Sequence, residues 1–297
     1  MSNLKNIARK LYLVLIISLL GYWAFSSRDV VLDLYSQARP SLLLVSAFLW
    51  LATHFLSPLI ISKSFAYFIG PVSYRDSLRI HIARLPYKYI PGGIWNTVAR
   101  ATDYAAFGFS TRALVKYFLV ENLLIVGVTF SLGGAMVATL YGGSHWVPIG
   151  SVVASVGVIL LIFTSYNPKL RSEQRKNPPA SGILAPVICS AIYWLLLACS
   201  FLFFIQAFPG LQLVATNMQV VAAFIFSWAI GYIAIFAPQG VGVSEFVTSQ
   251  LMISNLNGQA MMAFLVGFRF IGFFVDNACF LVVHLLRLFT DRDGGRQ

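Results

Sequence analysis

The sequence predicts an all-helical, polytopic membrane protein with about eight transmembrane elements. Of its 297 residues, 58% are hydrophobic and only 10% are charged, whereas a soluble domain has roughly 25% charged residues. The apolar residues form long runs, most of which approach or exceed the roughly 20 residues that a membrane-spanning helix needs. These runs lie at about 11–27, 40–62, 113–141, 147–166, 183–207, 217–236 and 259–288, with a shorter element at about 240–256.

The N-terminal third needs separate treatment. Basic residues precede the run 11–27, as in a signal peptide, but no small-residue cleavage site follows it cleanly, so we expect a retained first helix. The stretch 64–90 carries several charges between its apolar residues and is too polar to cross lipid alone. An interfacial amphipathic helix from about Ser73 to Leu85, followed by a re-entrant hairpin through Pro91, accommodates both properties.

Basic residues mark one set of loops. They lie before the first run, between 75 and 88, in the loop 167–182 and after 286, whereas 142–147 and 208–216 contain no Lys or Arg. Because loops rich in Lys and Arg stay cytoplasmic, we expect both termini in the cytoplasm. The net charge of +11 then reflects orientation and anionic lipid rather than nucleic acid, since the basic residues form no single patch.

Other kinds of chemistry lack a signal. Cys189, Cys199 and Cys279 lie in apolar runs without a paired spacing, which predicts neither a disulfide nor a zinc site. The four histidines are scattered, and no phosphate-binding loop, dinucleotide fingerprint or serine elbow occurs. We therefore expect no cofactor and no metal.

Two apolar stretches, 89–95 and 236–245, are interrupted by proline and glycine. In a bilayer such breaks persist only where protein or a watery cavity satisfies the freed backbone groups. One break in each half of the chain is typical of a transport site between repeats. The residues concerned are Pro91, Gly92, Gly93, Pro238, Gly240 and Gly242.

The halves also show weak internal symmetry. The offset that superimposes Pro91 on Pro238 places 113–141 over 260–288. We expect a single membrane domain over 1–297, with repeat halves at about 40–141 and 183–288 and the basic cytoplasmic loop 167–182 between them. The pattern leaves open whether the repeats are parallel or inverted.

Charged residues inside or beside the apolar runs are candidates for function, because charges at membrane depth are costly and usually face a bundle interior or cavity. Arg269 is the strongest candidate, since it lies among aromatic residues far from an interface. Asp276 lies close to the same helical face and is a candidate partner in a structural ion pair. The alternative is that the Arg269 guanidinium binds a phosphate, for which its planar fork is well shaped.

Arg100 lies about two and a half helical turns after Pro91. A half-helix starting there exposes backbone amides near Gly93, which attract anions, so Arg100 is either part of an anion pocket or an interfacial anchor. We expect Glu121 to find a tertiary partner such as Arg100. Trp95 is either an interfacial aromatic residue or a wall against a lipid chain.

Glu245 directly follows the second break. It either caps the helix that starts near Val243 or acts as a titratable gate. The expected substrate-binding residues are Arg100, Arg269, Trp95, Gly92, Gly93, Gly240 and Gly242. The expected gating or coupling residues are Glu245, Asp276, Glu121, Pro91 and Pro238.

The segments 85–100, 237–245 and 268–269 resemble, in order and spacing, the signature segments of the lysylphosphatidylglycerol synthase transmembrane-region family, also called flippase-like domain proteins. The best-known member joins such a domain to an aminoacyl transferase, whereas this chain resembles the stand-alone form. Gln239 departs from the family pattern, in which glycine is commoner. The matching residues are Pro91, Gly92, Gly93, Arg100, Pro238, Gly240, Gly242, Glu245 and Arg269.

The resemblance implies a multi-pass protein of the bacterial cytoplasmic membrane that flips an anionic phospholipid or a polyprenyl-phosphate-linked glycan lipid between leaflets. In that mechanism Arg100 and Arg269 neutralise the headgroup in a cavity between the halves. Glycosyltransferases or other envelope-biosynthesis proteins are the implied partners. Two alternatives stay open: a membrane-embedded lipid-modifying transferase with Glu245 as base, and a scaffold subunit of a polysaccharide synthesis complex.

Overall fold

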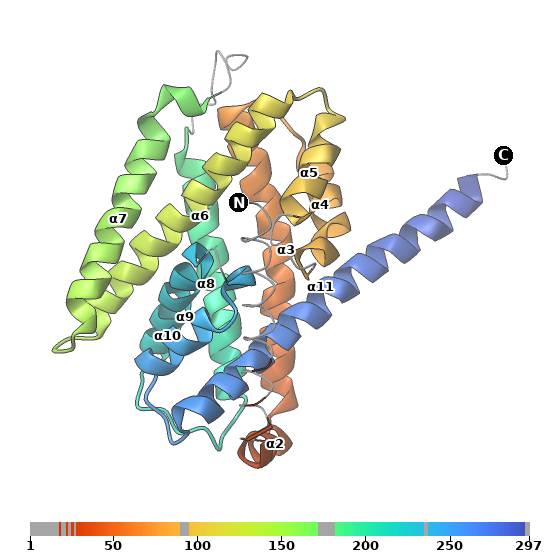
Figure 1. Ribbon diagram of the computed structural model, residues 1–297. Coiled ribbons are helices and arrows are strands. Elements are labelled where there is room, and N and C mark those ends of the chain that lie inside the picture. The colour runs from red at the N-terminus through yellow and green to blue at the C-terminus, as the bar shows by residue number, and fades with distance from the viewer. Residues whose placement is uncertain are drawn as a thin grey trace. The chain divides into compact units, whose positions relative to one another are not determined.

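The computed structural model describes residues 28–89, 95–171, 182–234 and 237–294, together with residues 18, 22, 25 and 26. This part of the chain is helical, with one isolated antiparallel bridge between Leu213 and Ser254 (Figure 1). The elements are α2 (Arg28–Ser36), α3 (Pro40–Phe68), α4 (Tyr74–Ala83), η1 (Leu85–Tyr89), α5 (Trp95–Ala105), α6 (Thr111–Leu140), α7 (Trp146–Tyr166), η2 (Pro168–Leu170), α8 (Leu184–Gln206), α9 (Asn217–Ile233), η3 (Pro238–Gly240), α10 (Val243–Leu251) and α11 (Gly258–Gly294).

Five of the described helices are long and apolar enough to cross a membrane. They are α3, α6, α7, α8 and the part of α11 from Gly258 to Leu285. The prediction of an all-helical fold is confirmed for the described residues, and each of these candidate spanning helices matches a predicted apolar run. The count of about eight stays a prediction, because the run 11–27 lies largely outside the described residues and α9 and α10 are shorter.

The predicted amphipathic helix near residue 73 is present as α4. Ser73 is its N-cap, and the Ser73 hydroxyl accepts a hydrogen bond from the Asp76 backbone N–H at 3.1 Å. Such a cap satisfies one of the donors that a helix start leaves unpaired. The first break was expected at Pro91, Gly92 and Gly93, which lie outside the described residues.

The chain divides into two compact units, each assembled from three stretches. The first unit comprises Met1–Leu49, Val126–Ile159 and Trp194–Ile271. The second comprises Trp50–Ile125, Leu160–Tyr193 and Gly272–Gln297. Each of the five candidate spanning helices contributes residues to both units, so the units do not follow the halves 40–141 and 183–288. The single domain and its repeat stay predictions.

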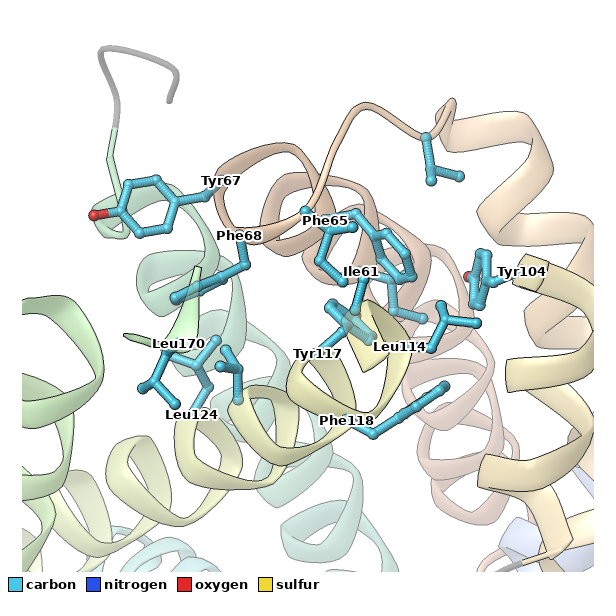
Figure 2. Packing of buried hydrophobic residues seen from close by; sticks show 14 of the residues in the cluster. Ile61, Phe65, Tyr67, Phe68, Tyr104, Leu114, Tyr117, Phe118, Leu124 and Leu170 are labelled. Atoms are coloured by element: carbon cyan, nitrogen blue, oxygen red, sulfur yellow. The ribbon is translucent and has the colours of Figure 1, made fainter. Parts of the chain in front are cut away.

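Within the second unit, an aromatic core joins the C-terminal part of α3 to α5 and to the start of α6. Figure 2 shows Phe65 close to Tyr104 and Tyr117, with ring centroids 4.5 Å and 3.8 Å from that of Phe65. All three side chains are fully buried. Because lipid supplies no hydrophobic driving force between helices, such close packing is what holds short α5 in place.

Within the first unit, small residues bring helices into backbone contact. A Cβ added at Gly134 of α6 would lie 2.5 Å from the Ala154 backbone N of α7. Ser46 of α3 and Ser200 of α8 are buried, and each hydroxyl donates to the carbonyl of the other residue, at 2.8 Å and 2.7 Å. Close approach and interhelical hydrogen bonds of this kind stabilise helix pairs in a bilayer.

Candidate functional site

In the first unit, α9 and α10 form a helical hairpin around the second break. Thr216 and Gln219 form a capping box at the start of α9. The two ends of the hairpin meet, since the Val214 backbone N–H donates to the Ile253 carbonyl at 3.0 Å. Neither helix is long enough to be a candidate membrane span. The chain therefore follows α9 to the break and returns along α10 to the residues that precede α9.

The break itself is a tight turn in the left-handed region of backbone space. Gln239, Gly240 and Gly242 have φ of 53°, 69° and 85°. Gly240 also packs on α9, where an added Cβ would lie 2.7 Å from the Gly231 carbonyl carbon. Glycine adopts such angles without steric cost, so Gln239 occupies a position that would suit glycine.

A charged cluster fastens this turn to α11. The Glu245 side chain is buried and forms an ion pair with Arg269 Nε. Glu245 Oε2 accepts from the Gly242 backbone N–H at 2.7 Å and from the Ser244 hydroxyl at 3.2 Å. Arg269 Nη2 donates to the Ser244 hydroxyl at 2.7 Å, and Nη1 donates to the Gln239 carbonyl at 3.2 Å. One arginine therefore contacts the break and the helix that follows it.

These contacts assign partners that the sequence left open. Glu245 accepts from the N-cap residue Gly242 and so occupies the capping position considered for it. Arg269 has Glu245 as its ion-pair partner, and Asp276 has Lys88 and His54. The ion pair considered between Arg269 and Asp276 is therefore replaced by separate ion pairs, because each charge meets an oppositely charged group from a neighbouring element.

In the second unit, Arg100 of α5 and Glu121 of α6 form the pair that the sequence suggested. Arg100 Nη2 and Nη1 donate to the two carboxylate oxygens of Glu121 at 2.7 Å and 3.2 Å. The guanidinium carbon lies 5.2 Å from the centre of the Phe118 ring. Trp95, the first residue of α5, is 46% exposed. Arg100 is thus held inside the protein rather than anchored at an interface.

Both ion pairs join a short helix to the long helix that follows it, but the positions of the arginine and the glutamate are exchanged between the two pairs. In the second unit, Arg100 on the short helix after the first break pairs with Glu121 on the long helix that follows. In the first unit, Glu245 on the short helix after the second break pairs with Arg269 on the long helix that follows. Each pair ties a short helix to a long apolar helix.

Asp276 is the centre of a further polar cluster in the second unit. Its carboxylate is 0% exposed and forms an ion pair with Lys88. It accepts from Trp50 Nε1 at 3.0 Å and from the Tyr89 hydroxyl at 2.6 Å, and His54 Nε2 lies 2.9 Å from its Oδ1 atom. These contacts offset part of the cost of removing the carboxylate from water.

Sequence reasoning placed Asp276 among the candidates but missed its partners. Trp50 and His54 come from α3, Lys88 and Tyr89 from η1, and Asp276 from α11, at sequence separations of nearly two hundred residues or more. The sequence held one signal for these partners: His54, one of the four histidines, lies inside an apolar run. Within the described residues, no group of His, Cys, Asp and Glu side chains is arranged to bind a metal ion.

Comparison of the chain with protein-family models and with curated proteins finds no match in either set.

Proposed function

We propose that this protein moves a lipid with an anionic headgroup between the leaflets of a membrane. The cargo class is an anionic phospholipid or a polyprenyl-phosphate-linked glycan lipid, whose shared feature is a phosphate next to apolar chains. The proposed location is the bacterial cytoplasmic membrane, with both termini in the cytoplasm.

The observation that carries the proposal is Arg269 on spanning helix α11. Its side chain is 28% exposed, and its contacts with Glu245, Gln239 and Ser244 engage Nε, Nη1 and Nη2. A guanidinium has five N–H groups, which leaves donors for a phosphate oxygen. Arginine in a membrane segment is rare and usually marks a polar pathway, which favours a binding role in addition to the contact with Glu245.

In this proposal the α9–α10 hairpin is re-entrant within the bilayer. A headgroup that enters beside the break meets the guanidinium, and this contact offsets part of the cost of removing a phosphate from water. The lipid chains stay in the surrounding bilayer. The lipid gradient, the membrane potential or a proton supplies the driving force.

The alternative transferase mechanism needs Glu245 as a base. Both of its carboxylate oxygens are already engaged, Oε1 by Arg269 and Oε2 by the Gly242 backbone N–H and the Ser244 hydroxyl. These contacts stabilise the charged carboxylate and favour a capping role. Mass spectrometry of lipids incubated with purified protein tests this alternative, which a new lipid product would support.

The test is transfer of a fluorescent phosphatidylglycerol across vesicles that contain the purified full chain. We expect Arg269→Ala to lose transfer, and Arg269→Lys to retain a small part because it keeps the charge but not the planar fork. Arg28→Ala is the matched control, since Arg28 is exposed and pairs with a neighbouring exposed Asp29.

Loss of fold must be separated from loss of function. Arg269→Ala leaves the buried Glu245 carboxylate unpaired, which by itself is strongly destabilising. The double variant Arg269→Ala, Glu245→Gln removes that charge, and size-exclusion chromatography checks that it remains monodisperse. Normal transfer by a folded double variant would refute the assignment of Arg269 to the headgroup.

A further inference from the structure

Four polar side chains of the second unit lie in a row that ends at Asp276. The Ser57 hydroxyl is 3.4 Å from His81 Nδ1, and His81 Nε2 is 3.2 Å from His54 Nδ1. His54 Nε2 is in turn 2.9 Å from Asp276 Oδ1. The row joins α3, α4 and α11, and its residues take no part in the contacts of Arg269.

The chemistry at the end of the row sets the direction of its hydrogen bonds. An ionised carboxylate only accepts, so the proton of His54 belongs on Nε2, which faces Asp276. Nδ1 of His54 then accepts from Nε2 of His81, and Nδ1 of His81 accepts from the Ser57 hydroxyl. Neutral imidazoles therefore give one consistent order to the hydrogen bonds from Ser57 through His81 to His54, and His54 Nε2 lies within ion-pair distance of Asp276.

The two ends of the row differ in burial. Asp276 is 0% exposed and His54 is 5% exposed, whereas His81 and Ser57 are only partly buried. His81 lies on α4, which is too short to be a candidate span and whose Arg75 and Arg79 are exposed. His81 is thus the less buried and Asp276 the more buried end of the row.

The surroundings of His81 favour its neutral form. Burial lowers the pKa of His81 well below its usual value, His54, Arg100 and Lys88 lower it further, and Asp276 opposes them. Asp276 faces Trp50 and His54 from α3, Lys88 and Tyr89 from η1, Tyr193 from α8 and Cys279 on its own helix.

We propose that His81, His54 and Asp276 form a proton relay that carries a proton from the edge of α4 to the buried carboxylate. The Ser57 hydroxyl passes its proton to His81 Nδ1 and takes another from hydronium, the Nε2 proton of His81 passes to His54 Nδ1, and the Nε2 proton of His54 passes to Asp276. The first two transfers each break one O–H bond, forming one N–H and one O–H bond, and the last two each break one N–H bond and form one N–H or O–H bond. The cluster gains one positive charge.

Protonation of Asp276 has a structural consequence. A neutral carboxylic acid no longer balances the Lys88 ammonium, which is otherwise its ion-pair partner. Lys88 belongs to η1, which directly precedes the first break. The relay therefore converts proton uptake into a change of charge balance at Lys88 in η1. The use of this change to drive lipid movement rests on the proposed function.

The relay is tested first without any lipid assay, by nitrogen NMR of the full chain labelled at histidine and titrated between about pH 5 and pH 8. We expect the neutral His54 and His81 rings both to carry their proton on Nε2. Asp276→Asn should shift the signals of His54 and His81 together and leave those of His145 and His284 in place. An opposite tautomer at either ring, or a His54 signal that ignores Asp276→Asn, would overturn the relay.

Coupling is then tested in vesicles of phosphatidylethanolamine and phosphatidylglycerol that contain the same fluorescent probe. We expect an imposed pH gradient to accelerate transfer by the unaltered chain about tenfold, the change that 1.4 kcal/mol represents. His81→Asn should lose this acceleration and keep the gradient-free rate, and His284→Asn should keep both. If the transfer rate does not change with the pH gradient, the coupling is refuted. If the chain transfers no probe but its histidines give the expected NMR signals, the proposed function is refuted and the relay is supported.

Discussion

Replacing Gly240 by alanine is expected to destabilise the first unit by about 3 kcal/mol. Gly240 has φ of 69°, where an L-residue costs roughly 1–2 kcal/mol more than glycine. The added Cβ would also lie 2.7–2.8 Å from three backbone atoms of Gly231. Backbone atoms cannot rotate away as a flexible side chain does, and overpacking typically costs about 1–3 kcal/mol.

Two other glycines of the same unit separate these contributions. Gly143 has φ of 76° and nothing within 4 Å of an added Cβ, so Gly143→Ala measures the backbone cost alone. Gly142 has open space and no left-handed angle. Gly142→Ala should therefore be neutral, or slightly stabilising because alanine restricts the unfolded chain.

The assay is unfolding of the purified protein in mixed detergent micelles with increasing sodium dodecyl sulfate, followed by circular dichroism. The expected order of stability is Gly142→Ala, then Gly143→Ala, then Gly240→Ala. If Gly240→Ala and Gly143→Ala lost equal free energy, the contact with Gly231 would contribute nothing, and the packed turn described for the second break would be wrong.

Two further perturbations test buried polar contacts by the same unfolding assay. Arg100→Leu should cost about 3–5 kcal/mol because it leaves the Glu121 carboxylate buried and unpaired, and adding Glu121→Leu should recover part of that loss; a double variant less stable than the single one would contradict this. Ser46→Ala should cost about 1 kcal/mol through the lost hydrogen bond to Ser200, and a variant as stable as the parent would show that the contact has no net value.

Parts of the candidate site could be predicted from local patterns. Ser73 ahead of a charged amphipathic stretch predicted the start of α4, because the cap and the helix are adjacent in sequence. Arg100 and Glu121 are separated by one short connection and the start of α6, so their pairing was also within reach. Neither inference needed a contact across distant parts of the chain.

The partners of Asp276 and Arg269 could not be predicted in this way. Residues a few turns apart on one helix suggested that these two charges pair, since position on a helical face is all that spacing reveals. Glu245 and Lys88 meet them instead because the α9–α10 hairpin and η1 bring charged groups beside α11. A buried charge takes the nearest well-placed counter-charge, whatever its place in the sequence.

The sequence by itself determined that the described chain folds into long apolar helices with an interruption near Pro238, because apolar run length and backbone chemistry are local properties. Only the tertiary structure decided that α10 returns along α9, that Gly240 rests on Gly231, and that His81, His54 and Asp276 form a row. The reason is physical: which side chains meet depends on how whole helices pack, and packing is set by close contacts between residues far apart in the chain.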